Sequence, residues 1–370
     1  MTCKTDAPAR AKQYIESLPF YIPGRAISAV ARGYGFDESS ILKLASNENP
    51  LGFSARVQKT LLELAVHPSS CYPDPDAAIL KLRLGEHYGV DTAWITAGSG
   101  SSEILDMAAR AFAGPGDTVV ISQYAFTSYY LAATAAGATA RVIPSPDYRH
   151  NLDAMLEATD DTTRLIYIAN PNNPTGSFVD LIEIRRFLDA VPPHVVVVLD
   201  EAYAEYLAPP LQSSPAKLVA DYANLIVART FSKIYGLAAL RIGYGIAQPA
   251  LSNTLNKVRP PFNTSSYAQA AAAAAIEDQD FVAGCRRMNE LGRAQLADAF
   301  GQRGLVHLPS AGNFVLVNVG DGMAVSQRLL EKAIIVRPVA NYGLPAWLRI
   351  TVGTADQNAR LLDALRTIEL

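Results

Sequence analysis

Short runs of β-branched and other apolar residues alternate along this chain with segments of helical periodicity. The runs are residues 118–122, 140–144, 164–170, 195–200, 224–230 and 243–247. Such alternation is typical of βαβ units arranged around a mostly parallel sheet. The run VVVVLD at 195–200 constrains the fold most, because an unbroken apolar strand is expected only where helices cover both faces of a sheet. The sequence therefore predicts an α/β fold in which helices flank a mostly parallel sheet.

The pattern changes after about residue 255, where long helices over 265–303 are followed by shorter strands and a last helix. This arrangement is typical of a smaller α+β domain. The chain has 370 residues, of which 49% are apolar, so it can bury one large core and a smaller one. We expect residues 45–258 to form a large domain, residues 259–370 to form a small one, and residues 1–44 to join the small domain.

The composition favours small-molecule chemistry. A net charge of −3 and a pI near 6.0 provide no overall field that would attract nucleic acid or an anionic membrane. The three cysteines are widely spaced and form no CxxC pair, which suits a reducing cytoplasm. The first residues lack the apolar segment of a secretory signal, and every apolar run is interrupted before the ~20 residues that a membrane span needs. We therefore expect a soluble cytoplasmic protein, and no metal site is expected.

Polar residues gather where three of the predicted strands end. They are residues 170–176, Asp200 and residues 230–233. Open α/β sheets bind their ligands outside the carboxyl ends of the strands, so we expect the functional site there.

The segment TFSKIYGLAALR places Lys233 beside two hydroxyl residues, Thr230 and Ser232, and eight residues before Arg241. Two hydroxyls and a guanidinium near one lysine indicate an anchored phosphate beside an amine. Lysine forms imines with aldehydes, and burial or cationic neighbours can lower its pKa so that it reacts. An ordinary solvated lysine in a loop would give the same local sequence.

Three further segments belong with this lysine. DEAY sets Asp200 at the end of the buried strand, with Tyr203 three residues on, although a strand-end Asp can also cap a helix. NPNNPTG at 170–176 is a turn that can present the amide of Asn173. GSGSSEIL at 98–105 opens an amphipathic helix, and the amino ends of helices bind phosphate.

Together and in this order, these four segments resemble the histidinol-phosphate aminotransferase branch of the fold-type I enzymes that use pyridoxal 5′-phosphate (PLP). The resemblance covers nearly the whole chain. It also includes LPFYIPGR, LASNENPLG, YPDP at 72–75, GYGIA, IIVRPV and LRITVGT. It implies a PLP-dependent transferase fold of type I, with a smaller α+β domain.

The resemblance also assigns roles around the cofactor. Lys233 would carry PLP as a Schiff base and later move the proton. Asp200 would hold the pyridine nitrogen in its protonated form, which makes the ring an electron sink. Asn173 and Tyr203 would bond the ring hydroxyl, and Phe126 would stack on the ring face. The residues implied for the phosphate are Ser101 and Ser102 through their backbone amides, Thr230, Ser232 and Arg241.

Substrate and partner residues follow from the same resemblance. Arg349, helped by Arg337, would take the anionic groups of the substrates, while Tyr21 and Asn47 would line the mouth of the site. Tyr72 would reach the phosphate in the neighbouring subunit, which implies a homodimer with shared active sites. Without the surrounding match, an exposed strand arginine in a surface ion pair would be the favoured interpretation of Arg349.

The implied activity is ping-pong transfer of an amino group from histidinol phosphate to 2-oxoglutarate, yielding glutamate, in histidine biosynthesis. Three alternatives stay open from the sequence: an aromatic amino-acid aminotransferase, a PLP-dependent decarboxylase of phosphorylated amino acids, and a PLP-sensing module without turnover. An aromatic donor becomes the better expectation if Arg337 points to solvent. The sequence departs from the family pattern at two positions near the cofactor, and these departures make the identity of the substrate harder to predict. Ser102 stands where relatives carry a carboxylate, and Phe126 stands where some carry tyrosine.

Overall fold

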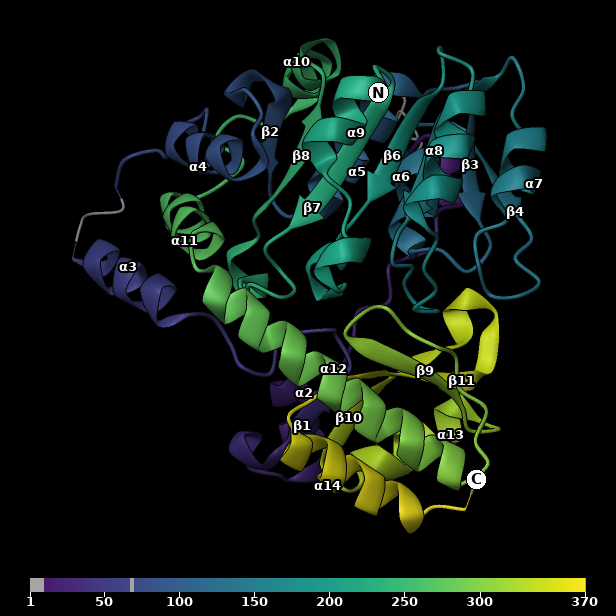
Figure 1. The fold of residues 1–370 in the computed structure, drawn as a ribbon. Helices are drawn as coiled ribbons and strands as arrows, with labels where there is room; N and C mark the ends of the chain where they lie inside the picture. Colours follow the sequence, from purple (N-terminus) through teal and green to yellow (C-terminus); the bar gives the residue numbers. More distant parts are fainter. Residues whose placement is uncertain (1–9, 67–69, 370) are drawn as a thin grey trace, which may run out of the picture.

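A seven-stranded sheet forms the centre of the larger part of the computed structural model, which describes residues 10–66 and 70–369 (Figure 1). In chain order its strands are β2 (Ile95–Gly98), β3 (Thr118–Ser122), β4 (Thr139–Ile143), β5 (Thr163–Ala169), β6 (Val196–Asp200), β7 (Leu225–Thr230) and β8 (Gly243–Ala247). Their order across the sheet is β2-β8-β7-β6-β5-β3-β4. The strands from β7 to β4 pair in parallel, whereas β8 is antiparallel to both of its neighbours. The mostly parallel sheet is therefore confirmed.

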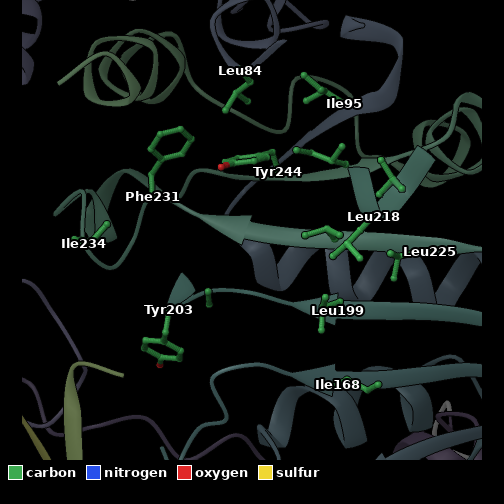
Figure 2. Packing of buried hydrophobic residues seen from close by; sticks show 14 of the residues in the cluster. Leu84, Ile95, Ile168, Leu199, Tyr203, Leu218, Leu225, Phe231, Ile234 and Tyr244 are labelled. Atoms are coloured by element: carbon green, nitrogen blue, oxygen red, sulfur yellow. The ribbon is translucent and has the colours of Figure 1, made fainter. Parts of the chain in front are cut away.

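Helices cover both faces of this sheet. They are α4 (Ala78–Tyr88), α5 (Ser101–Phe112), α6 (Thr127–Ala135), α7 (Leu152–Glu157), α8 (Leu181–Ala190), α9 (Pro215–Asp221), α10 (Pro249–Val258) and α11 (Ser266–Ile276). Helix α3 (Ala55–Ala65) packs against α11 rather than on the sheet (Figure 1). Val197 and Leu199 of β6 belong to one buried cluster and Val198 to the cluster on the other face. Figure 2 shows Leu199 in the first cluster, together with Leu218 of α9. Burial on both faces explains the unbroken apolar run at 195–200.

A four-stranded sheet forms the second part. Its order is β1 (Leu42–Leu44), β10 (Ile334–Val339), β11 (Leu344–Thr351) and β9 (Phe314–Asn318). The remaining α-helices are α1 (Gln13–Glu16), α2 (Ile27–Tyr34), α12 (Gln279–Gln302), α13 (Gly322–Leu330) and α14 (Ala355–Arg366). The long helix α12 runs from the large part to the small one (Figure 1). The expected domain boundaries stay a prediction, and the first nine residues of the 1–44 segment lie outside the described residues.

Short 3-10 helices cover Glu38–Ser40, Thr92–Trp94, Ala204–Tyr206, Pro209–Leu211, Ala238–Leu240 and Ala340–Tyr342. Two strands were not expected from the sequence, β1 and β2. Both are short, and β2 runs directly into a Gly/Ser loop, so neither produces a recognisable apolar run. Within the described residues, none of the helices has the length and apolar character needed to cross a membrane.

The start of β8 lies against the start of α5, and a glycine makes this approach possible. A Cβ atom on Gly243 would stand 2.4 Å from the backbone nitrogen of Ser101 and 2.8 Å from the carbonyl oxygen of Arg229. Real Cβ atoms do not approach backbone atoms this closely. Gly243 thus allows the amino end of α5 to sit directly beside the carboxyl end of β7.

We predict that Gly243→Ala destabilises the protein by about 1–3 kcal/mol, because the new methyl group forces backbone segments apart. Urea unfolding monitored by circular dichroism measures the difference in unfolding free energy. Gly245→Ala, two residues along the same strand, is the matched control, because its Cβ would meet side-chain methyl groups of Ile104 and Ile226 that can shift. Equal stability losses for the two variants would contradict the prediction.

Candidate active site

A cavity of about 270 Å³ lies where β5, β6 and β7 end, between the large sheet and the two inner strands of the small sheet, β10 and β11. Of the residues singled out in the sequence, those that line it are Tyr21, Asn47, Ser101, Ser102, Phe126, Asn173, Asp200, Tyr203, Thr230, Ser232, Lys233, Arg241, Arg337 and Arg349. Tyr72 does not. The carboxyl ends of the parallel strands therefore bring together residues that are far apart in the sequence.

Lys233 follows β7 and is partly buried in this cavity. Its Nζ donates to the carbonyl oxygen of Ser46 at 3.5 Å and lies 5.6 Å from the centre of the Tyr203 ring. Burial, helped by the charge of Arg349, lowers the pKa of the Lys233 amine to about 8. The interpretation of Lys233 as an ordinary solvated lysine is therefore wrong.

Asp200 ends β6 and is only 6% exposed. One carboxylate oxygen accepts a hydrogen bond from the Tyr129 hydroxyl at 2.7 Å, and the other accepts one from the Ala202 backbone N–H at 3.1 Å. Burial raises the pKa of Asp200 to about 6, while the bond from Tyr129 acts in the opposite direction. The carboxylate thus caps the following backbone and also faces the cavity.

Asn173 and Tyr203 also line the cavity. Asn47 donates through Nδ2 to the Tyr203 hydroxyl at 2.8 Å. The amide oxygen of Asn173 accepts a hydrogen bond from Arg349 at 2.5 Å. The two N–H groups of the Asn173 amide are donors that can bind a ligand.

Arg349 is 7% exposed, and one of its terminal nitrogens donates to the carbonyl oxygen of Ala45 at 2.7 Å. Its Nε is buried without a hydrogen-bond partner. Arg337 is 8% exposed and lies opposite Arg349 in the β10–β11 pairing, and it donates to the carbonyl oxygen of Ile22 at 2.6 Å. The alternative of an exposed Arg349 in a surface ion pair is wrong, and Arg337 faces the cavity rather than solvent.

An anion-binding corner forms beside Lys233. Helix α5 begins at Ser101 directly after Gly100, whose φ of 83° is one that glycine adopts readily. The first backbone N–H groups of a helix have no partner inside it, so Ser101 and Ser102 can offer theirs to a ligand. Arg241 donates to the Ser232 hydroxyl at 3.2 Å, which places its guanidinium at the same corner.

Tyr72 lies outside this cavity in a single chain. The residue is 80% exposed, and its ring stacks on Phe262 with a centroid distance of 4.5 Å. Both residues line a separate surface hollow that also contains Arg241.

Sequence analysis missed several residues of the cavity. They are Gly24, Ala45, Ser46, Glu48, Tyr129, Ala169, Pro171, Ala202, Ala238 and Tyr342. Only Tyr129 has a local signal, since it lies three residues after Phe126 and helical spacing puts such residues on one face. Among residues 10–66 and 70–369, no group of three or more His, Cys, Asp or Glu side chains could hold a metal ion.

Known proteins are similar to this chain over nearly its whole length. The family model for aminotransferase class I and II matches residues 39–365. The chain is 51% identical to histidinol-phosphate aminotransferase 2 of Ralstonia nicotianae, over 96% of both proteins. It is 49% identical to histidinol-phosphate aminotransferase 1 of Cupriavidus pinatubonensis, over 95% of this chain and 94% of that protein.

A crystal structure of histidinol-phosphate aminotransferase from Sinorhizobium meliloti in complex with PLP superposes with a TM-score of 0.89. It is 31% identical, and the match covers 97% of both chains. With a family model over most of its length and close full-length relatives, this chain belongs to the histidinol-phosphate aminotransferase family of class I and II aminotransferases.

Proposed function

We propose that the protein is a PLP-dependent aminotransferase that transfers the amino group of histidinol phosphate to 2-oxoglutarate in histidine biosynthesis. One observation carries the proposal: an amine of lowered pKa, a buried carboxylate and an anion-binding corner meet in one cavity with two further buried arginines. These groups fit the aldehyde, the pyridine nitrogen and the phosphate of PLP. When bound, PLP supplies an electron sink for the bonds at the substrate's Cα.

Lys233 holds the cofactor and moves the proton. With a pKa of about 8, a useful fraction of its amine is neutral near neutral pH and can attack an aldehyde. Once a substrate amine takes its place, the same Nζ would remain in the cavity, where it would be placed to take the proton from the substrate's Cα and to give a proton back.

Asp200 keeps the pyridine nitrogen protonated, because a buried carboxylate stabilises a cation beside it. Phe126 stacks on the ring, and the amide of Asn173 and the hydroxyl of Tyr203 bond the ring oxygen. Ser101, Ser102, Thr230, Ser232 and Arg241 hold the phosphate.

Arg349 and Arg337 bind the anionic groups of the substrates. A guanidinium forms bidentate pairs with carboxylates and with phosphates, so this pair suits both 2-oxoglutarate and histidinol phosphate. The burial of Arg337 at the cavity supports a phosphorylated donor over an aromatic amino acid. Tyr21 is half exposed and lines the entrance used by either substrate. The expectation that Asn47 also lines the mouth is wrong, because Asn47 is 1% exposed and binds the Tyr203 hydroxyl inside the cavity.

The first prediction concerns the donor. Histidinol phosphate and glutamate are expected to convert the aldehyde form of the bound cofactor into the aminated form, whereas phenylalanine, tyrosine and aspartate convert it more slowly. Absorbance spectra after mixing with each single donor measure this half-reaction. Conversion by phenylalanine but not by histidinol phosphate would indicate the aromatic enzyme, release of carbon dioxide would indicate a decarboxylase, and no conversion by any donor would refute amino transfer.

The second prediction concerns pH. The neutral Lys233 amine is the nucleophile, so attachment of PLP to the cofactor-free protein should accelerate as pH rises through the pKa of about 8 and then level off. Over the unit of pH below this pKa the rate should rise about fivefold. Borohydride reduction at timed intervals, followed by peptide mass spectrometry, measures the bond to Lys233. Lys257→Ala should behave like the wild type, and a rate independent of pH would contradict the lowered pKa.

We also propose a homodimer in which Tyr72 of one subunit reaches the phosphate site of the other, in the cytoplasm. The exposure of the Tyr72 ring and its position near Arg241 at one surface hollow support this arrangement.

Hybrid dimers test the shared site. Tyr72→Ala and Lys233→Ala are each expected to be poorly active alone. In an equal mixture after subunit exchange, one site of each hybrid dimer has both residues intact, so activity should return to about a quarter of the wild-type value. Light scattering checks that the variants are dimers. If mixing restores no activity, Tyr72 does not act across a subunit interface.

A further inference from the structure

Tyr129 is a fully buried tyrosine whose hydroxyl contacts the acid of the site. It lies on α6 with 0% of its surface exposed, and its hydroxyl is 2.7 Å from a carboxylate oxygen of Asp200. Burial, together with the negative charge of Asp200, raises the pKa of Tyr129 well above its ordinary value. The phenol therefore stays protonated, and Tyr129 is the donor while Asp200 is the acceptor.

The packing around Tyr129 fixes the direction of this hydroxyl. Its ring stacks on Tyr167 of β5 with a centroid distance of 4.7 Å and an interplanar angle of 5°. The Tyr167 hydroxyl is itself held, because it donates to the carbonyl oxygen of Leu105 at 2.6 Å. The Phe126 ring meets Tyr129 edge-on at 5.9 Å. A tyrosine enclosed in this way has little freedom to turn its hydroxyl elsewhere.

Two donors therefore hold the Asp200 carboxylate from the protein side, Tyr129 on one oxygen and the Ala202 N–H on the other. Hydrogen bonds to the charged form of a carboxyl group favour that form. Two other titratable groups, Lys233 and Glu201, affect the pKa of Asp200. Lys233 favours the charged carboxylate and Glu201 opposes it. The charge of Asp200 in turn raises the pKa values of Tyr203 and Tyr167.

We propose that Tyr129 is a positioning residue of the active site: its hydroxyl keeps Asp200 charged and turns the remaining lone pairs of the carboxylate toward the pyridine nitrogen. The second half of this role depends on the proposed function, because it needs a bound pyridine ring. The first half concerns Asp200 alone. The two halves can therefore be measured separately.

The cofactor-free protein tests the first half. In Tyr129→Phe, the pKa of Asp200 should rise by about 1 to 2 units above its value of about 6, since a hydrogen bond to a charged group is lost. NMR of protein labelled with ¹³C in the aspartate carboxyl groups measures the titration, and Asp200→Asn identifies the signal. Tyr167→Phe removes a hydroxyl from the same stacked pair and should leave this pKa nearly unchanged, as should Tyr130→Phe on the same helix.

The holoenzyme tests the second half. With PLP labelled with ¹⁵N at the ring nitrogen, Tyr129→Phe should shift the resonance toward that of the unprotonated ring, while Tyr167→Phe should not. In the Asp200→Asn background the Tyr129→Phe change should add no further shift, because its effect passes through the carboxylate. If Tyr129→Phe does not fold, ortho-fluorotyrosine at position 129, a stronger donor, should lower the pKa of Asp200 instead.

The outcomes separate the two proposals. An unchanged pKa of Asp200 in Tyr129→Phe, in a wild type that converts its donor, would overturn the role of Tyr129 alone. If no donor converts the wild type but the carboxyl titration still shifts, amino transfer fails while the effect of Tyr129 on Asp200 stands.

Discussion

The burial of one carboxylate at the end of β6 is the constraint on which the site depends. Removing an ionised group from water is costly unless the protein supplies partners, and the pKa of about 6 for Asp200 reflects that cost. Burial acts on Lys233 in the opposite direction and lowers the pKa of its amine to about 8. Titratable groups whose environments alter their pKa values in this manner are characteristic of acid–base sites. A cationic ring bound between them would relieve the burial of Asp200 and leave the amine reactive.

A buried cluster of charged residues links the chain after β6 to β7, near the ends of these two strands. Arg229 of β7 pairs with Glu201 at 2.7 Å and with Glu205 at 3.5 Å. Because side chains alternate along an extended segment, Glu201 points away from the side taken by Asp200. Such buried pairs are weak evidence for added stability, yet they join the chain after β6 to β7. The pairing thus restrains the segments from which Asp200 and Lys233 extend.

Sequence patterns predicted the features that depend on local residues. The run at 195–200 identified a strand covered on both faces, and the strand ends located the cavity. Contacts set by packing could not be predicted. Tyr129 meets Asp200 only because α6 packs against the sheet, and no local pattern links two residues 71 positions apart. The burial of Arg337 depends likewise on the N-terminal segment that covers it. Whether Tyr72 contacts a second subunit also cannot be predicted from the sequence, because such a contact depends on how two chains associate.

Under the proposed function, the two neighbouring arginines would allow one pocket to serve two different anions. Arg337 and Arg349 donate to backbone or amide carbonyl oxygens, and within residues 10–66 and 70–369 neither forms an ion pair with a carboxylate. Carbonyl partners hold the guanidinium groups in place without neutralising their charge. Burial lowers the pKa of Arg349, and the charge of Arg337 acts in the same direction. Under the proposed function, an incoming carboxylate or phosphate would therefore meet positive charge that is already oriented.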